Sequence, residues 1–278
     1  MGGDDISPSL RPVIRVGVFG AGGRMGATVC KAVVADPELE LVAAVDPHHA
    51  GLDVRTVTGA DATHLQIAPE ADALSDAGAH VAVDFTVAAA ARENVAWCAA
   101  HGVHAVVGTT GLGDADIEEL RRLFPEAEGR PNCLIAPNFA IGAVLMMRFA
   151  ELAAPWFETA EIIELHHDNK ADAPSGTAML TAQRMAQVSQ EWSPDPTKDE
   201  VVAGARGGAT RDGIHIHSVR LRGMVAHQEV LLGTTGQSLT IRHDSYDRSS
   251  FMPGVLLAVK GVADRPGVTV GLDALLGI

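Results

Sequence analysis

The stretch ELHHDNKADAPSGTA, residues 164–178, gathers side chains that could transfer a proton and bind an anion. His166, His167 and Lys170 supply three positive or protonatable groups within five residues. An imidazolium or an ammonium can deliver a proton near neutral pH once its surroundings have tuned its pKa. We therefore expect this stretch to hold an acid–base group beside a small anionic ligand.

A predicted helix begins directly afterwards and offers further donors to the same ligand. Ser175 suits the N-cap position, and Gly176 and Thr177 then present backbone N–H groups that no helix carbonyl can accept. A carboxylate bound there would meet a helix N-terminus, the Lys170 ammonium and the Thr177 hydroxyl together. Such a cluster suits a small dicarboxylate. The alternative is a solvated loop before a capped helix.

The paired histidines do not indicate a metal site. His166 and His167 end a predicted strand, where successive side chains point to opposite faces and are poorly placed to chelate one ion. The sequence has no H-E-x-x-H motif or cysteine pair in support of a metal. We expect no catalytic metal.

A glycine-rich turn near the start of the chain, VGVFGAGGRMG, could bind a pyrophosphate. It lies between a predicted strand and a predicted helix, where backbone N–H groups can approach phosphate closely. The candidate binding residues are Gly20, Gly23, Arg24, Met25 and Gly26. Met25 stands at the last glycine position of the usual dinucleotide fingerprint, so a plain structural turn is the alternative.

Asp46 ends the next predicted strand and could accept hydrogen bonds from the hydroxyls of an adenosine ribose. The alternative is a turn-forming residue before Pro47. A cofactor with a 2′-phosphate would need a cation beside Asp46, but Pro47 and His48 follow it. Arg24 could reach a phosphate. We predict that NADH is used at least as well as NADPH.

Further predicted strand ends could line the same crevice, because ligands of open α/β sheets bind at the carboxyl ends of the strands. Each of these ends alone is typical of a plain turn. Together, after a glycine-rich turn, they favour a nicotinamide site. The residues concerned are Phe85, Thr86, Gly108, Thr109, Thr110, Ala136, Pro137, Asn138 and Phe139.

Short apolar runs alternate with helical stretches in the first half of the chain. Strands are predicted at 13–19, 40–46, 80–86, 104–110 and 133–139, with helices at 24–37, about 88–101 and about 114–124. This alternation predicts βαβ units and a doubly wound parallel sheet. Residues 50–79 are less regular, and no elements are predicted there.

The pattern changes after residue 140. Helices are predicted at 140–157 and 175–190, a strand at 160–167, and a loop at 191–200. Runs at 214–221, 227–234 and 238–244 alternate apolar and polar residues, which predicts a half-exposed mixed or antiparallel sheet. A last helix at 251–266 is expected to return to the first domain.

Composition narrows the class of protein. The net charge of −14 over 278 residues argues against nucleic acid as a partner, because a phosphate backbone requires a basic face. No apolar run reaches the about 18 residues that span a membrane. Cys30, Cys98 and Cys133 form an odd, unpatterned set, which favours a reducing, cytoplasmic location over a disulfide framework.

ELHHDNKADAPSGTA resembles the signature of the dihydrodipicolinate reductases, also called 4-hydroxy-tetrahydrodipicolinate reductases, of lysine and diaminopimelate biosynthesis. The segments VGVFGAGGRMG, VDFT, VVGTTG, APNFAIGAV and VRLRGMVAHQEVLLGTTGQSLTIRHDSYDRSSFMPGVLLAV match that family in the same order. The resemblance covers nearly the whole chain from residue 13 onward and is strongest to the actinobacterial branch. It implies an NADH- or NADPH-dependent oxidoreductase that reduces a cyclic imine dicarboxylate to tetrahydrodipicolinate.

The resemblance also implies an architecture: a Rossmann-type doubly wound parallel sheet, a second α+β domain with an open mixed sheet, and a homotetramer built through those open sheets. We accordingly expect a dinucleotide-binding domain at 13–138 completed by 247–278, and a substrate-binding and oligomerisation domain at 139–246. The opening residues, MGGDDISPSLRP, are acidic and polar, so we expect a disordered tail at 1–12.

Carried onto this chain, the family motif makes His166 and Lys170 the acid–base pair and leaves open which of them delivers the proton. It places the substrate carboxylates against His167, Lys170, Ser175, Gly176 and Thr177. Many relatives carry an arginine directly after the ribose-binding acid, and Pro47 stands there in this chain. This departure puts strict use of NADPH in doubt.

Two rival functions remain open from the sequence. One is another Rossmann reductase, such as a homoserine- or aspartate-semialdehyde-type dehydrogenase, although the latter would need an activated cysteine. The other is a dinucleotide-binding protein that has lost its chemistry. Such a protein would not need His166 and Lys170 together.

Overall fold

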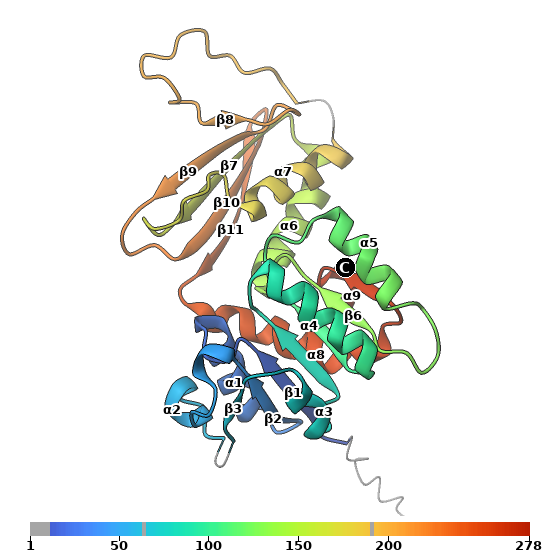
Figure 1. Ribbon diagram of the computed structural model, residues 1–278. Coiled ribbons are helices and arrows are strands. Elements are labelled where there is room, and N and C mark those ends of the chain that lie inside the picture. Colours follow the sequence, from blue (N-terminus) through green and yellow to red (C-terminus); the bar gives the residue numbers. More distant parts are fainter. Residues whose placement is uncertain (1–11, 63–64, 190–191) are drawn as a thin grey trace, which may run out of the picture. The chain divides into compact units, whose positions relative to one another are not determined.

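Short strands rich in valine and alanine build the first sheet of the protein in a computed structural model, which describes residues 12–62, 65–189 and 192–278 (Figure 1). Its seven strands are parallel and lie in the order β12-β6-β5-β4-β1-β2-β3. Strand order runs outward in both directions from the β1/β4 pair, as in dinucleotide-binding sheets. The expected doubly wound parallel sheet is confirmed. Its strands are β1 (Ile14–Phe19), β2 (Leu39–Val45), β3 (Ile67–Ala68), β4 (Val81–Asp84), β5 (His104–Val107), β6 (Cys133–Ile135) and β12 (Val268–Val270).

Helices connect these strands, and proline or glycine residues mark the ends of two of them. The first helix stops at Ala35, two residues before Pro37, and α4 is closed by Gly102 in the left-handed conformation at φ 74°. Residues 50–79, unplaced by the sequence, hold two short helices and β3. The helical elements are α1 (Arg24–Ala35), η1 (Pro47–His49), α2 (Val54–Thr58), α3 (Asp72–Asp76), α4 (Ala88–His101), α5 (Asp114–Leu123), α8 (Met252–Gly261) and η4 (Val262–Asp264).

The second sheet has five strands in the order β11-β10-β7-β9-β8. Only β7 and β9 pair in parallel, so the expected mixed sheet is confirmed. Its strands are β7 (Thr159–His166), β8 (Gly208–Ala209), β9 (His215–Arg220), β10 (Ala226–Thr234) and β11 (Gln237–Ser245). The accompanying helical elements are α6 (Ile141–Ala153), η2 (Ala154–Trp156), α7 (Gly176–Val188), η3 (Arg248–Phe251) and α9 (Asp273–Leu276).

Helices α6 and α7 pack against one face of the second sheet (Figure 1). Alternate residues of β7 face them, and Ile162 and Glu164 on that side are completely buried. The register extends this face across the sheet, because Glu164 lies beside Gln228 of β10 and beside Ser218 of β9. A polar row therefore crosses one end of an otherwise apolar face.

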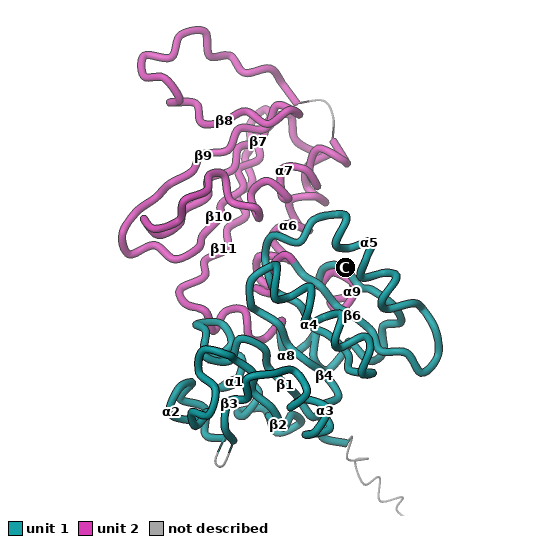
Figure 2. Tube along the Cα trace, in the orientation of Figure 1, with its two compact units in different colours: residues 1–136, 255–271 teal, residues 137–254, 272–278 magenta. Residues whose placement is uncertain are grey.

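The chain divides into two compact units, residues 1–136 with 255–271 and residues 137–254 with 272–278 (Figure 2). This division differs from the expected one, which assigned all of 247–278 to the first domain. Gly254 packs so closely on the Phe139 carbonyl that an added Cβ would overlap its oxygen. Asp273 of α9 forms an ion pair with Arg184 of α7, with 2.7 Å between Oδ1 and Nη1. These contacts hold both segments in the second unit.

Several elements are shorter than predicted, because strands of the first sheet end before the small and polar residues that follow them. The sequence did not predict β12, a strand of three residues, or β8, a strand of two. Residues 1–11 of the expected disordered tail lie outside the described residues. None of the described helices is long and apolar enough to cross a membrane.

Candidate active site

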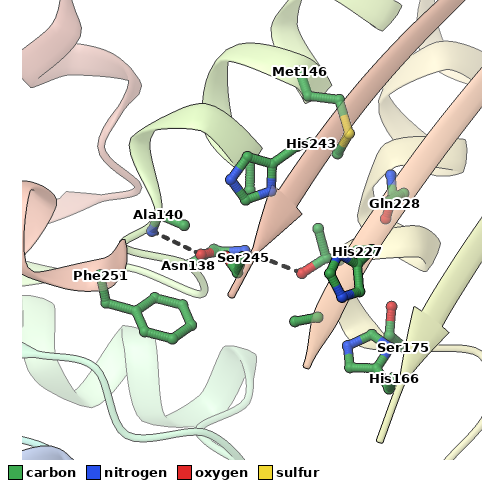
Figure 3. A pocket seen from close by; sticks show the side chains of 13 residues that line it. Asn138, Ala140, Met146, His166, Ser175, His227, Gln228, His243, Ser245 and Phe251 are labelled. Atoms are coloured by element: carbon green, nitrogen blue, oxygen red, sulfur yellow. Dashed lines mark hydrogen bonds between the residues drawn. The ribbon is translucent and has the colours of Figure 1, made fainter. Parts of the chain in front are cut away.

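A pocket lies at the carboxyl end of β7, on the face of the second sheet that carries α6 and α7 (Figure 3). His166, the last residue of β7, points into it. The pocket's polar lining comes from four segments of the second unit: the start of α6, the end of β7, the start of α7 and the β10/β11 pair. These polar residues are Asn138, His166, Ser175, Thr177, His227, Gln228, His243 and Ser245.

A buried carboxylate lies behind His166. The side chain of Glu164 has no exposed surface, and its Oε2 lies 2.5 Å from His166 Nδ1. Arg220 donates to both oxygens of Glu164, over 3.0 Å from Nη1 and 2.9 Å from Nη2. The Ser175 backbone N–H donates to Oε1 over 3.2 Å. The carboxylate thus joins β7, β9 and the start of α7.

Burial acts in opposite directions on the two members of this pair. It would raise the pKa of Glu164, but hydrogen bonds from Arg220, Ser218 and His166 outweigh it, and the pKa lies below the usual range. Burial lowers the pKa of His166, the Glu164 carboxylate partly restores it, and the charges of Lys170 and Arg220 lower it again. Glu164 is therefore ionised and His166 largely neutral at neutral pH.

Lys170 and His167 follow β7 in the connecting loop. Both oxygens of Asp172 accept hydrogen bonds from Lys170 Nζ, each over 2.8 Å. His167 is exposed, and neither residue lines the pocket. The charge of Lys170 is nevertheless close enough to lower the pKa of His166. The structure therefore brings Lys170 near the pocket without placing its ammonium in it.

The start of α7 has the predicted capped geometry. Ser175 is buried, and its hydroxyl accepts a hydrogen bond from the Ala178 N–H over 3.2 Å. Thr177 lines the pocket, and its hydroxyl accepts a hydrogen bond from Asn138 over 3.3 Å. Gly176 is exposed beside them. The helix terminus and the Thr177 hydroxyl can together receive a carboxylate.

Strands β10 and β11 contribute pocket residues that the sequence did not single out. Gln228 is buried, and its amide nitrogen donates to the Thr181 hydroxyl over 2.7 Å. His243 packs against Gly142, and burial lowers its pKa. The alternating pattern of these strands placed their residues on two faces, but only the register with β7 identifies the face that carries the pocket.

In the glycine-rich turn of the first unit, backbone atoms of different residues pack directly against one another. Gly20 has a left-handed φ of 66°, and Gly26 lies so close to Gly20 that a Cβ would overlap its carbonyl oxygen. Gly23 caps α1, while Gly23 and Arg24 are exposed and Met25 is half-buried. This shape leaves the N-terminus of α1 open to a pyrophosphate.

Asp46 holds the same turn to the end of β2. Its Oδ2 accepts a hydrogen bond from the Gly22 N–H over 3.0 Å, and its Oδ1 accepts one from the His48 N–H over 3.0 Å. It also caps η1, so the turn-forming role weighed as the alternative is present. His49 Nδ1 lies 3.2 Å from Oδ1. Asp46, which the sequence predicts to bind a ribose, therefore already has several partners within the protein.

The ends of β4 and β5 meet around Asp84, which lies in the predicted strand end 84–86 but was assigned no role from the sequence. This buried carboxylate accepts hydrogen bonds from the hydroxyls of Thr86 over 2.7 Å and Thr109 over 2.8 Å. Gly108 faces the ring of Phe85 with no space for a Cβ. Thr110 is exposed beyond them. Four of the predicted strand-end residues thus lie together at the β4 and β5 ends.

The predicted group Ala136, Pro137, Asn138 and Phe139 divides between the units. Ala136 belongs to the first unit, where its N–H donates to the Val107 carbonyl over 3.1 Å, and the other three belong to the second. Asn138 lies beside Thr177 in the pocket described above. Among the described residues, no cluster of three or more His, Cys, Asp or Glu side chains could hold a metal ion.

Comparisons with known proteins agree along nearly the whole chain. Residues 14–139 match a family model described as dihydrodipicolinate reductase, N-terminus, and residues 142–276 match one described as dihydrodipicolinate reductase, C-terminus. The 4-hydroxy-tetrahydrodipicolinate reductase of Cutibacterium acnes is 52% identical, with 96% of this chain and 100% of that relative covered. The reductase of the same name from Nocardia farcinica is 52% identical, with 95% and 99% covered.

A solved structure extends the similarity to the fold. Dipicolinate-bound dihydrodipicolinate reductase from Paenisporosarcina sp. TG-14 is 40% identical, with a TM-score of 0.82. The match covers 94% of this chain and 99% of that one. The combination of a seven-stranded parallel sheet and a five-stranded mixed sheet is therefore shared with a reductase of known structure.

Proposed function

The chain belongs to the dihydrodipicolinate reductase family, and we propose that it reduces 4-hydroxy-tetrahydrodipicolinate to tetrahydrodipicolinate in lysine and diaminopimelate biosynthesis. It is an oxidoreductase that uses NADH or NADPH. One observation carries the assignment to this site: an imidazole backed by a buried carboxylate opens into the same pocket as a capped helix N-terminus.

The substrate-binding residues follow from charge. Dipicolinate, bound by the Paenisporosarcina relative, is a dicarboxylate, and a dianion in a protein of net charge −14 needs local cations. One carboxylate is proposed to bind the first turn of α7 through Gly176 and Thr177, with Ser175 holding that turn in place. His167 and Lys170 are proposed to bind the other. A substrate carboxylate would compete with Asp172 for the Lys170 ammonium.

His166 and Lys170 are proposed as the acid–base pair. The cofactor supplies a hydride, and its addition to a conjugated imine places negative charge on the ring, which a nearby proton donor neutralises. The Lys170 ammonium pairs with Asp172, whereas burial lowers the pKa of His166 and keeps its imidazole largely neutral. Lys170 is therefore the better donor, and His166 Nε2 is the better hydrogen-bond acceptor or relay.

The glycine-rich turn fits a dinucleotide, because its backbone is as tight as the turn of a dinucleotide-binding fold. A Cβ at Gly26 would overlap the Gly20 carbonyl oxygen, so only glycine fits there. The proposed contacts are backbone N–H groups from Gly20 to Gly26 for the pyrophosphate, with Arg24 and Met25 flanking it, and Asp46 for the ribose. The nicotinamide half is assigned to Phe85, Thr86, Gly108, Thr109, Thr110 and the segment 136–139.

We propose a homotetramer assembled through the open face of the second sheet. Ile163 and Leu165 of β7 and Leu231 of β10 lie on the face away from α6 and α7 and are half-buried. An apolar sheet face of this kind is typical of an interface between subunits. A cytoplasmic location is supported by three cysteines that are free and buried.

A coupled assay tests the reaction. Pyruvate and aspartate semialdehyde are supplied with the preceding synthase, and absorbance at the nicotinamide band is followed with NADH and NADPH separately. Lys170→Ala should lower turnover roughly 100-fold or more, because it removes a proton donor, while NADH binding measured by fluorescence stays nearly intact. Lys260→Ala is the matched control, since Lys260 pairs with Asp36 and Glu38 in the first unit. Wild-type protein that binds NADH without synthase-dependent oxidation would refute the proposed function.

A further inference from the structure

The hydrogen bonds around Glu164 determine which nitrogen of His166 carries the proton. The other groups that hydrogen-bond this carboxylate act as donors: Arg220 on both oxygens, the Ser175 N–H on Oε1, and the Ser218 side chain. A buried carboxylate beside a guanidinium is ionised and has no proton of its own to give. The hydrogen in the 2.5 Å contact between Oε2 and Nδ1 therefore belongs to His166.

We propose that Glu164, held in place by Arg220, is the positioning residue that fixes His166 as the Nδ1–H tautomer with Nε2 directed to the substrate pocket. The statement that this pocket binds the substrate rests on the proposed function. The assignment of the His166 tautomer does not, because it follows from the hydrogen bonds alone. Glu164 acts through His166 and has no exposed surface to touch a substrate. The arrangement follows the logic by which a carboxylate orients a catalytic imidazole in other enzymes.

Arg220 also contacts the loop that carries Lys170. Its Nη2 also donates to the Asp172 backbone carbonyl over 2.6 Å, and Asp172 is the residue whose side chain pairs with Lys170. One guanidinium thus joins the carboxylate behind His166 to the loop that carries Lys170. We extend the proposal accordingly: Arg220 sets the two members of the acid–base pair relative to one another within the second unit.

Glu164→Gln is the decisive substitution, because it keeps the shape of the side chain, removes its negative charge and replaces one of the two acceptor oxygens by an NH2 donor. The amide must present its NH2 group either to His166 and Arg220 Nη1 or to Arg220 Nη2 and the Ser175 N–H. The first orientation donates to Nδ1 and forces His166 into the Nε2–H tautomer. The second leaves the side-chain oxygen on His166 but places two donors against the amide nitrogen, which is less favourable.

The same strand supplies a matched control. Glu161 lies on the opposite face of β7, where it pairs with His217 over 2.5 Å and with Arg206 over 2.5 Å. Glu161→Gln therefore removes an equivalent Glu–His–Arg interaction that does not line the pocket. Thermal unfolding of both variants shows whether the loss of a carboxylate from this strand alone explains any change.

The tautomer is read directly by NMR of histidine labelled with 15N in the full-length protein, with His166 assigned by its absence in His166→Asn. Wild type should show His166 protonated at Nδ1, Glu164→Gln should shift it to Nε2, and Glu161→Gln should leave it unchanged. A wild-type Nε2–H tautomer, or no change in Glu164→Gln, overturns the proposal. Because this measurement needs no turnover, it decides the proposal even where the proposed reaction fails.

Measurements of kcat then distinguish a positioning role of Glu164 from a purely structural one. Glu164→Gln should lower kcat roughly 10- to 100-fold in the wild-type background, the range typical for residues that orient a reacting group. In the His166→Asn background the same change should have almost no further effect, because Glu164 acts through the imidazole. An equal loss in both backgrounds would show a structural role and overturn the proposal.

Discussion

Replacing Arg220 by methionine should destabilise the protein strongly, and increasingly so as pH rises. The Glu164 side chain has no exposed surface, and Arg220 provides two hydrogen bonds of 3.0 and 2.9 Å to it. Methionine keeps an unbranched apolar stem but leaves the carboxylate without its cation. Removing one partner of a buried pair costs about 3–5 kcal/mol, and the lower end applies because Arg220 is 20% exposed and water can enter.

The pH dependence follows from the direction of each pKa. In wild type, burial would raise the pKa of Glu164, but hydrogen bonds led by Arg220 outweigh burial and lower it. The carboxylate therefore contributes stability above its unfolded-state pKa. This contribution is lost as pH falls through the folded-state pKa. Without Arg220, burial dominates and raises that pKa. The variant then loses stability as pH rises, by at most about 1.4 kcal/mol per pH unit.

Urea unfolding at fixed protein concentration, from about pH 5 to about pH 8, measures both effects. Arg184→Met is the control, because Arg184 and Asp273 form a similar bidentate pair whose side chains are 22% and 24% exposed. That variant should lose about 1 kcal/mol or less, with no dependence on pH above about pH 5. A loss below about 1 kcal/mol in Arg220→Met, or a gap from wild type that stays constant with pH, would refute the reasoning.

Other predictions concern the first unit. Gly26→Ala should abolish NADH binding measured by fluorescence, because its Cβ would overlap the Gly20 carbonyl oxygen. Gly208→Ala in the second unit is the control, because a Cβ there makes no close contact and the backbone is not left-handed. Pro47→Arg should raise the ratio of kcat/KM for NADPH over NADH roughly 10-fold, since a guanidinium beside Asp46 would pair with a 2′-phosphate; an unchanged ratio would contradict this placement. Burial raises the pKa of the Cys30 and Cys133 thiols to about 12, so both should resist alkylation at pH 8 in native protein and react after unfolding, as mass spectrometry would show.

Local patterns were sufficient to predict much of the architecture. The apolar runs that became β1, β4 and β5 are buried on both faces, so their sequences lack polar alternation and indicate a parallel sheet. The Ser175 cap at the start of α7 depends on residues within one helical turn, and it was predicted for that reason. Very short strands such as β12 carry no such pattern, because three residues cannot establish a period.

The sequence by itself determined the residue types of the site, since His166, Lys170 and the α7 start are adjacent in the chain and their chemistry is local. Tertiary structure decided what surrounds them. Arg220 is 56 residues from Glu164, and only the parallel pairing of β7 with β9 places its guanidinium against that carboxylate. The same is true of Asp84 with Thr109 in the first unit. Hydrogen bonds between strands depend on register, and register is set by the packing of the whole sheet rather than by any short stretch of sequence.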